Sequence, residues 1–182
     1  MEEKRERWEE HFCLDREDVV QAGDRAGMLD TALHMPAFCR EAWRLGLEAP
    51  LPATPWGGFK EVLICGMGGS AIGGDILRAY AQRRASIPFF INRPYTLPAW
   101  VSSRTLLVFV SYSGDTEETI AAYHEGVRGK RVVITSGGTI ANLAFQAEEP
   151  LIIIPPGIPA RSALPFLLIP ILVLLARLDI LP

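Results

Sequence analysis

Glycines and hydroxyl side chains gather in two short segments, each directly after a run of apolar residues. The first segment, Gly66–Gly74, reads GMGGSAIGG and surrounds Ser70 with five glycines. Glycine lets backbone N–H groups approach an anion closely, and a helix that begins here adds a partial positive charge. A tight strand-to-helix turn with a serine cap needs fewer glycines. The segment therefore predicts phosphate binding, with the Ser70 hydroxyl as a further donor.

The second segment, Ser111–Thr116, reads SYSGDT and carries three hydroxyl groups just where a helix is expected to begin. Ser111, Ser113 and Thr116 can each donate a hydrogen bond to a phosphate oxygen. Taken alone, the same residues are equally consistent with ordinary helix capping. Two such segments after separate strands favour one anion site, because ligands of parallel sheets bind beyond the carboxyl ends of the strands.

Two further loops contain residues that are candidates for binding a ligand or stabilising charge. The segment Ser136–Thr139, SGGT, is interpreted as a glycine turn with a threonine cap rather than as a binding loop. The segment Pro155–Ser162, PPGIPARS, carries Arg161 in a proline-rich loop. A guanidinium there can stabilise an oxyanion or clamp a sugar oxygen, and an arginine that only ties down the loop is equally consistent with the sequence.

A dinucleotide site is the minor alternative for the first segment. Gly66, Gly68 and Ala71 match the fingerprint G-x-G-x-x-G/A. That fingerprint requires an acidic residue after the second strand to hold the ribose, and this chain has Asn92 followed by Arg93. Arg93 can serve a 2′-phosphate, which keeps an NADP-binding Rossmann domain open, but this alternative gives the hydroxyl-rich segment no role.

The elements that must position these loops alternate between strand and helix. Five short, nearly continuous apolar runs are typical of strands buried on both faces of a parallel sheet: Val62–Cys65, Phe89–Ile91, Leu106–Val110, Val132–Thr135 and Leu151–Ile154. Helices are expected over Ala71–Gln82, Glu117–Gly126 and Ile140–Ala147. The pattern predicts an α/β fold: a three-layer α/β/α doubly wound sandwich with a five-stranded parallel sheet.

A helical lead-in precedes this domain. Residues 1–50 are predicted to form helices that pack on the sheet, and residues 51–182 to form the binding domain. Apolar residues recur at helical spacing from Asp24 to Leu45, with a break expected at Pro36 and a stop at Gly46. The charged stretch Glu2–Glu10 is expected to be a solvated helix or arm.

Composition excludes several classes of function. The 182 residues carry a net charge of −3, without the basic excess of a nucleic-acid-binding protein. The charged amino-terminal stretch predicts no secretory signal. Cys13, Cys39 and Cys65 form no CxxC pair, so we expect reduced thiols, a cytoplasmic location and no metal site. The apolar run Ala163–Ala176 is shorter than the roughly 20 residues of a membrane-spanning helix and predicts a buried helix instead.

The motifs GMGGSAIGGD, SYSGDTEET, SGG and PARSA, in this order, resemble the sugar-isomerase (SIS) family. Within that family the likeness is to the N-terminal half of bifunctional phosphoglucose/phosphomannose isomerases, with their flavodoxin-like SIS fold. It extends from about Leu14 to the end of the sequence.

The resemblance implies an aldose or ketose 6-phosphate as the ligand. Its binding residues would be Gly68, Gly69, Ser70, Ser111, Ser113 and Thr116. Arg161 matches the family arginine that steadies the enediolate formed during aldose–ketose isomerisation. No metal and no organic cofactor are implied, because the family moves the proton with side chains.

The sequence departs from the family in two respects. Asp115 stands where the family usually has Asn, which adds a carboxylate close to a dianionic phosphate. The family's general base, a Glu, and its ring-opening His lie in a second SIS domain, and neither has a counterpart in this sequence. Two hypotheses follow: an isomerase whose base comes from a second SIS domain or from the partner in a homodimer, and a sugar-phosphate-binding module without turnover.

Overall fold

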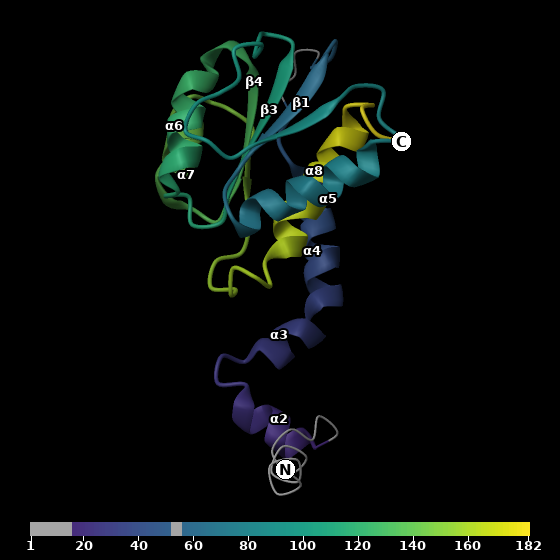
Figure 1. Cartoon of the computed structure of the whole chain (residues 1–182), viewed down its shortest axis with the longest axis vertical. Helices are drawn as coiled ribbons and strands as arrows, with labels where there is room; N and C mark the ends of the chain where they lie inside the picture. Colours follow the sequence, from purple (N-terminus) through teal and green to yellow (C-terminus); the bar gives the residue numbers. More distant parts are fainter. Residues whose placement is uncertain (1–15, 52–55) are drawn as a thin grey trace, which may run out of the picture.

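A five-stranded, all-parallel sheet forms the centre of the protein. The computed structural model describes residues 16–51 and 56–182, and its strands lie in the order β2-β1-β3-β4-β5 (Figure 1). Their bounds are Glu61–Cys65 for β1, Phe89–Asn92 for β2, Thr105–Ser111 for β3, Lys130–Thr135 for β4 and Leu151–Ile153 for β5. All five predicted strands form, with ends that differ by a residue or two.

Helices cover both faces of the sheet. On one face lie α4 (Met35–Glu48), α5 (Gly69–Ala81) and α8 (Leu164–Arg177), and on the other lie α6 (Glu117–Glu125) and α7 (Gly138–Gln146). A short 3-10 turn, η1 (Gly126–Arg128), follows α6. This arrangement confirms the predicted three-layer α/β/α sandwich.

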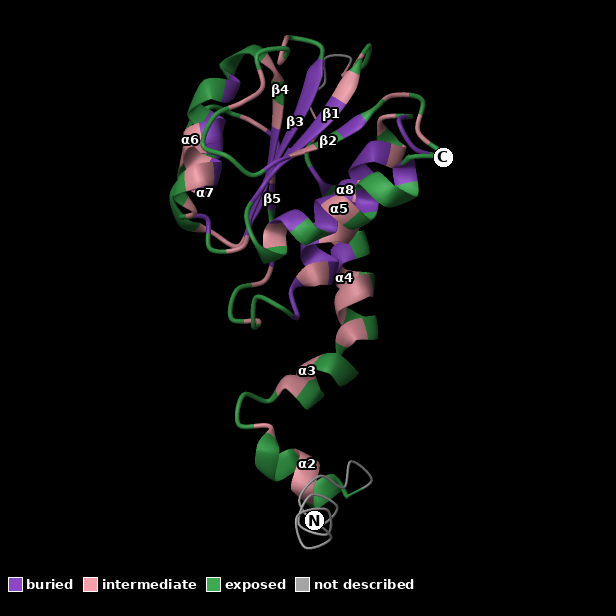
Figure 2. Ribbon diagram, in the orientation of Figure 1, coloured by how far each residue is buried: buried purple, intermediate pink, exposed green. Residues whose placement is uncertain are grey.

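The central strand β3 is buried along its whole length (Figure 2). Successive side chains of a strand point to opposite faces of the sheet. Val108 accordingly joins the core cluster beneath α4, α5 and α8, whereas Phe109 joins the cluster beneath α6 and α7. The continuous apolar runs of the sequence reflect this burial on two sides.

The apolar run near the end of the sequence forms the buried helix α8, as predicted. A Cβ placed on Gly46 of α4 would lie 2.7 Å from Cβ of Val173 and 3.1 Å from Cα of Pro170 in α8. Gly46 therefore allows the two helices to cross closely, and the expectation of a helix stop at this glycine is wrong. Within residues 16–51 and 56–182, no helix combines the length and the apolar character needed to cross a membrane.

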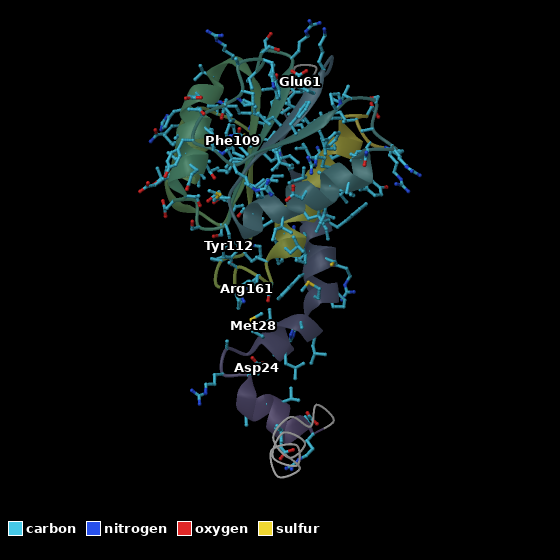
Figure 3. The ribbon with its side chains drawn as sticks, in the orientation of Figure 1. Asp24, Met28, Glu61, Phe109, Tyr112 and Arg161 are labelled. Atoms are coloured by element: carbon cyan, nitrogen blue, oxygen red, sulfur yellow. The ribbon has the colours of Figure 1, made fainter. Side chains whose placement is uncertain are left out.

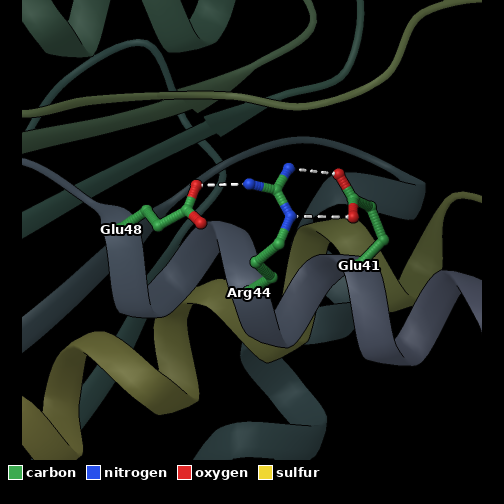
Figure 4. A network of polar contacts seen from close by, with 3 residues as sticks. All are labelled: Glu41, Arg44 and Glu48. Carbon is green, nitrogen blue, oxygen red and sulfur yellow. Dashed lines mark hydrogen bonds and ion pairs between the residues drawn. The ribbon is translucent and has the colours of Figure 1, made fainter.

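Two short helices, α2 (Glu17–Gly23) and α3 (Met28–Leu33), extend from the start of α4 as an arm (Figure 1). Neither contributes a buried residue. Pro36 lies in the first turn of α4, where the predicted break between helices occurs. The exposed face of α4 carries an ion-pair network of Arg44 with Glu41 and Glu48 (Figure 4). The predicted solvated segment Glu2–Glu10 lies outside the described residues.

Candidate functional site

The order of the strands creates a switch point between β1 and β3 at the carboxyl edge of the sheet, which is where the ligand crevice of an open α/β sheet lies. The sequence passes from β2 back across β1 to β3, and the helices that follow β1 and β3 lie on opposite faces. Ligands of open α/β sheets bind at such a switch point. The loops on its two sides belong to Gly66–Gly74 and Ser111–Thr116. They are in contact, because the backbone N–H of Tyr112 donates to Ser70 Oγ at 3.3 Å.

The turn between β1 and α5 depends on glycine at two positions. Gly68 has φ 52° and ψ −125°, a conformation that residues with a Cβ rarely adopt. A Cβ on Gly66 would lie 2.8 Å from the carbonyl oxygen of Val110 in β3. The turn thus lies close against the neighbouring strand. No side chain caps the start of α5, but the N–H groups of Ser70 and Ala71 already donate to the carbonyl oxygens of Met67 and Gly68 at 3.0 and 3.2 Å. What α5 offers an anion is therefore the positive end of its dipole, together with the Ser70 hydroxyl.

The hydroxyl groups of the loop after β3 form a small network. Ser111 is 1% exposed, and its Oγ accepts from the N–H of Gly114 at 3.1 Å and hydrogen-bonds to Thr116 Oγ1 at 3.0 Å. The exposed Ser113 accepts from the N–H of Asp115 at 3.3 Å. Thr116 is the N-cap residue of α6, yet its side chain makes no capping hydrogen bond. Ordinary side-chain capping therefore does not account for Thr116, and the first N–H groups of α6 have no capping side chain.

The loop after β4 interlocks with the loop after β3. A Cβ on Gly114 would lie 1.8 Å from the carbonyl oxygen of Gly137. Asp115 Oδ1 accepts from the backbone N–H of Thr139 at 2.8 Å and from its hydroxyl at 2.7 Å. These bonds hold the pKa of the Asp115 carboxyl below its ordinary value. The carboxylate that departs from the family pattern is thus bonded to the first turn of α7.

Arg161 lies on the loop between β5 and α8, at the same end of the domain as Tyr112 (Figure 3). The carbonyl oxygen of the preceding Ala160 lies 4.0 Å from the point where a Cβ on Gly69 would be, so this loop reaches the start of α5. Arg161 is exposed, and no hydrogen bond or ion pair of its guanidinium occurs among the described residues. The cation is available to a ligand at the carboxyl edge.

Comparisons with known proteins relate the chain to sugar-phosphate enzymes. No family model matches it. It is 36% identical over 155 residues to the bifunctional phosphoglucose/phosphomannose isomerase of Caldicellulosiruptor bescii, an alignment that covers 84% of this chain and 45% of that protein. The protein of the same name from Aquifex aeolicus is 37% identical over 120 residues, which is 64% of this chain and 38% of the relative. The chain thus spans less than half the length of these relatives.

Solved structures of phosphosugar enzymes share the fold. The tagatose-6-phosphate ketose/aldose isomerase of Escherichia coli superposes with a TM-score of 0.60 at 19% identity, covering 88% of this chain and 50% of that one. The C-terminal domain of the glucosamine-fructose-6-phosphate aminotransferase of Francisella tularensis gives a TM-score of 0.63 at 14% identity, covering 88% and 51%. The chain thus has the fold of the sugar-isomerase (SIS) proteins, and its sequence is similar to part of the bifunctional phosphoglucose/phosphomannose isomerases.

Several polar residues at the edge of this SIS domain were not predicted from the sequence. Tyr112 is the main one, because its hydroxyl and both backbone groups bond to other loops. Tyr95, on the loop after β2, lies so close to Glu118 and Glu117 of α6 that their charges raise the pKa of its phenol. Residue type alone gave no signal, because each partner comes from a different part of the sequence.

The structure also locates His124, a possible acid–base group, and Arg93, the residue that the dinucleotide alternative requires. His124 lies in the last turn of α6, about 10 Å from the helix start at the rise of an α-helix, and so away from the crevice. Arg93, which the NADP alternative requires, forms an ion pair with Asp75 of α5. Nowhere in the described SIS domain do three His, Cys, Asp or Glu residues gather as a metal site would need.

Proposed function

We propose that this SIS domain binds an aldose or ketose 6-phosphate and serves aldose–ketose isomerisation together with a second SIS domain or a partner subunit. The observation that carries the proposal is the contact between Ser70 and the backbone of Tyr112. It joins the glycine-rich and the hydroxyl-rich loop at the switch point of the sheet. A site with two anion-binding loops suits a phosphorylated ligand better than a neutral sugar.

The phosphate has a set of donors on both sides of the crevice. The hydroxyls of Ser113 and Thr116, with Ser111 beneath them, supply side-chain donors, and the uncapped start of α6 supplies N–H groups. On the other side, α5 contributes the positive end of its dipole and the Ser70 hydroxyl. Hydrogen bonds to an ionised phosphate are stronger than neutral ones. The bonding of Asp115 to Thr139 supports the proposal, because these two donors offset the charge of the carboxylate.

The catalytic part of the proposal concerns Arg161 and a missing base. In the family pattern this arginine faces the enediolate, whose negative charge a guanidinium stabilises. Proton transfer between C1 and C2 needs a general base within hydrogen-bond reach. His124 lies away from the crevice, which favours a base from elsewhere. A non-catalytic sugar-phosphate-binding module is the second candidate, on the same observation.

The cellular setting is part of the proposal. Cys39 and Cys65 are free thiols, and Cys65 is buried at the end of β1, where burial raises its pKa. Free thiols suit a reducing compartment, which supports our proposal of a cytoplasmic location. We further propose that the domain works in a homodimer or beside a second SIS domain.

Calorimetric titration of the purified chain with glucose 6-phosphate, fructose 6-phosphate and mannose 6-phosphate tests the binding site. A hydrogen bond to a charged group contributes about 1.5–3 kcal/mol, so Ser113→Ala and Thr116→Ala should each weaken binding roughly 10- to 100-fold. Ser86→Ala, on an exposed serine just before β2, is the matched control and should change nothing. Equal affinities of all four proteins would contradict the site.

Two further measurements separate the candidates. Conversion of fructose 6-phosphate to glucose 6-phosphate by the chain alone would exclude the non-catalytic module. Turnover only after addition of a second SIS domain would support a base supplied from elsewhere. Titration with NADPH tests the Rossmann alternative, which fails if NADPH does not bind while a sugar phosphate raises the melting temperature.

A further inference from the structure

The backbone of Tyr112 connects its own loop to the loops that follow β1 and β4. Its N–H donates to Ser70 Oγ in the first turn of α5 at 3.3 Å. Its carbonyl oxygen accepts from the hydroxyl of Ser136 at 2.6 Å and from the backbone N–H of Ser136 at 3.1 Å, both in the loop after β4. The flanking Ser111 and Ser113 belong to the proposed phosphate site. The backbone of Tyr112 therefore ties together the loops that follow β1, β3 and β4.

The side chain of Tyr112 reaches a fourth loop. Its hydroxyl donates to the carbonyl oxygen of Pro155 at 3.1 Å and accepts from the N–H of Ile158 at 2.8 Å. Both partners belong to the segment between β5 and α8 that carries Arg161. Among the described residues, these are the hydrogen bonds that hold the backbone of residues 155–158. The three prolines of this loop lack an N–H, which leaves it few donors of its own.

Arg161 follows that connection by three residues, inside a turn in which the N–H of Ser162 donates to the carbonyl oxygen of Pro159 at 2.8 Å. β5 is only three residues long and lies at the edge of the sheet, so the strand gives the loop little support. Beyond Ile158 the backbone of Ala160 comes to Gly69 at the start of α5. Ser162 is buried, with its hydroxyl 4.0 Å from the sulfur of Met28 on the arm. The free guanidinium of Arg161 extends from a segment held at one end by α8 and at the other by the Tyr112 hydroxyl.

We propose that Tyr112 is a positioning residue whose hydroxyl fixes Arg161 relative to the phosphate loop. This inference rests on the proposed function and adds to it how the site recognises both ends of its ligand. Ser113 and Thr116 bind the phosphate, and Arg161 faces the oxyanion at the other end. The phenol sets the spacing between them without touching the ligand.

The test uses three probes that share a phosphate but differ at the far end. 5-Phospho-D-arabinonate has a carboxylate where the enediolate has its charge, D-arabinitol 5-phosphate has a hydroxyl there, and inorganic phosphate has neither. The ratio of the affinities for the first two probes reports the contribution of Arg161. Arg161→Ala should bring this ratio close to one.

Tyr112→Phe keeps the ring and removes only the hydroxyl. We expect its affinity for phosphate and for the arabinitol phosphate to stay within about twofold, and its affinity for the arabinonate to fall about fivefold or more, in the range of measured couplings between contacting groups. The double variant with Arg161→Ala should bind the arabinonate no more weakly than Arg161→Ala alone. Tyr80→Phe, on an exposed tyrosine of α5, is the control and should leave the ratio unchanged.

Ile158→Pro removes one of these two hydrogen bonds, the one that the N–H of residue 158 donates to the phenol oxygen, and keeps the tyrosine. It should lower the ratio as Tyr112→Phe does. If Tyr112→Phe weakens all three probes by one factor, or if its effect adds fully to that of Arg161→Ala, the inference is wrong while sugar-phosphate binding stands. If the wild-type chain binds none of the probes, the proposed function fails, and this inference fails with it.

Discussion

The contact between the loops after β3 and β4 leads to a sharp prediction for Gly114. This residue has φ +79°, which only glycine adopts readily. An alanine Cβ here would lie 1.8 Å from the carbonyl oxygen of Gly137 and 2.9 Å from Cα of Gly138. Both are backbone atoms, so no side-chain rotation relieves the overlap. Gly114→Ala must separate the two loops.

The expected loss of stability has two parts. A left-handed conformation costs a residue with a Cβ roughly 1–2 kcal/mol. Forcing extra atoms into a closely packed site costs typically about 1–3 kcal/mol more. Gly114→Ala should therefore lower the free energy of unfolding by about 2–5 kcal/mol.

Gly157 supplies a matched control. Its φ is +80°, but a Cβ there meets no atom within 4 Å. Gly157→Ala should lose only the backbone contribution, about 1–2 kcal/mol. The entropy that alanine removes from the unfolded chain is the same in both variants and cancels in their difference. Urea denaturation of the two variants and the wild type measures the values directly.

Ligand binding gives the second measurement for this prediction. The displaced loop carries Ser113 and Thr116, so Gly114→Ala should also weaken the binding of glucose 6-phosphate at least tenfold, the effect of about 1.4 kcal/mol. Gly157→Ala should keep near-wild-type affinity. Equal urea midpoints for the two variants, together with unchanged affinity in Gly114→Ala, would refute the close contact between the loops.

Three further predictions concern stability and charge. Asp115→Ala should melt below the wild type at pH 7. Because folding lowers the pKa of this carboxyl, its stabilisation is present above the unfolded value of about 3.9. The difference in melting temperature should therefore narrow as the pH falls through the folded-state pKa, which lies below that value. Arg177→Met loses hydrogen bonds to the last carbonyls of α4 and should be destabilised by about 1 kcal/mol in urea, with unchanged sugar-phosphate affinity. Arg131→Met leaves the largely buried Glu149 without its cation and should lose about 3 kcal/mol, which Glu149→Gln in the same chain should partly restore.

Much of the fold could be predicted because burial leaves a direct trace in the sequence. A strand covered on both faces needs apolar residues without interruption, and β3 is the clearest example. The ends of helices were harder to predict, because a glycine can either stop a helix or lie inside one where another helix crosses closely. Gly46 looked like a stop and instead lies inside α4, where the absence of a side chain admits Val173.

The candidate site was predictable in its parts but not in its connections. Gly66–Gly74 and Ser111–Thr116 were found by composition, and the strand order explains why they meet. The roles of Tyr112 and Asp115 were not foreseen in the same way. Their partners lie between 24 and 46 residues away in the sequence, and hydrogen bonds of that range exist only once the sheet is assembled.

The two loops of the crevice follow strands that differ greatly in length and in how many neighbouring strands they pair with. The hydroxyl-rich loop follows β3, which is paired along its length with β1 and β4. The loop of Arg161 follows β5, an edge strand of three residues. Central, fully paired strands exchange their amide protons only on global unfolding, whereas weakly supported edges open locally. The site should therefore open in two stages. The loop of Arg161 opens locally in the native ensemble, while the hydroxyl-rich loop stays formed until the domain unfolds.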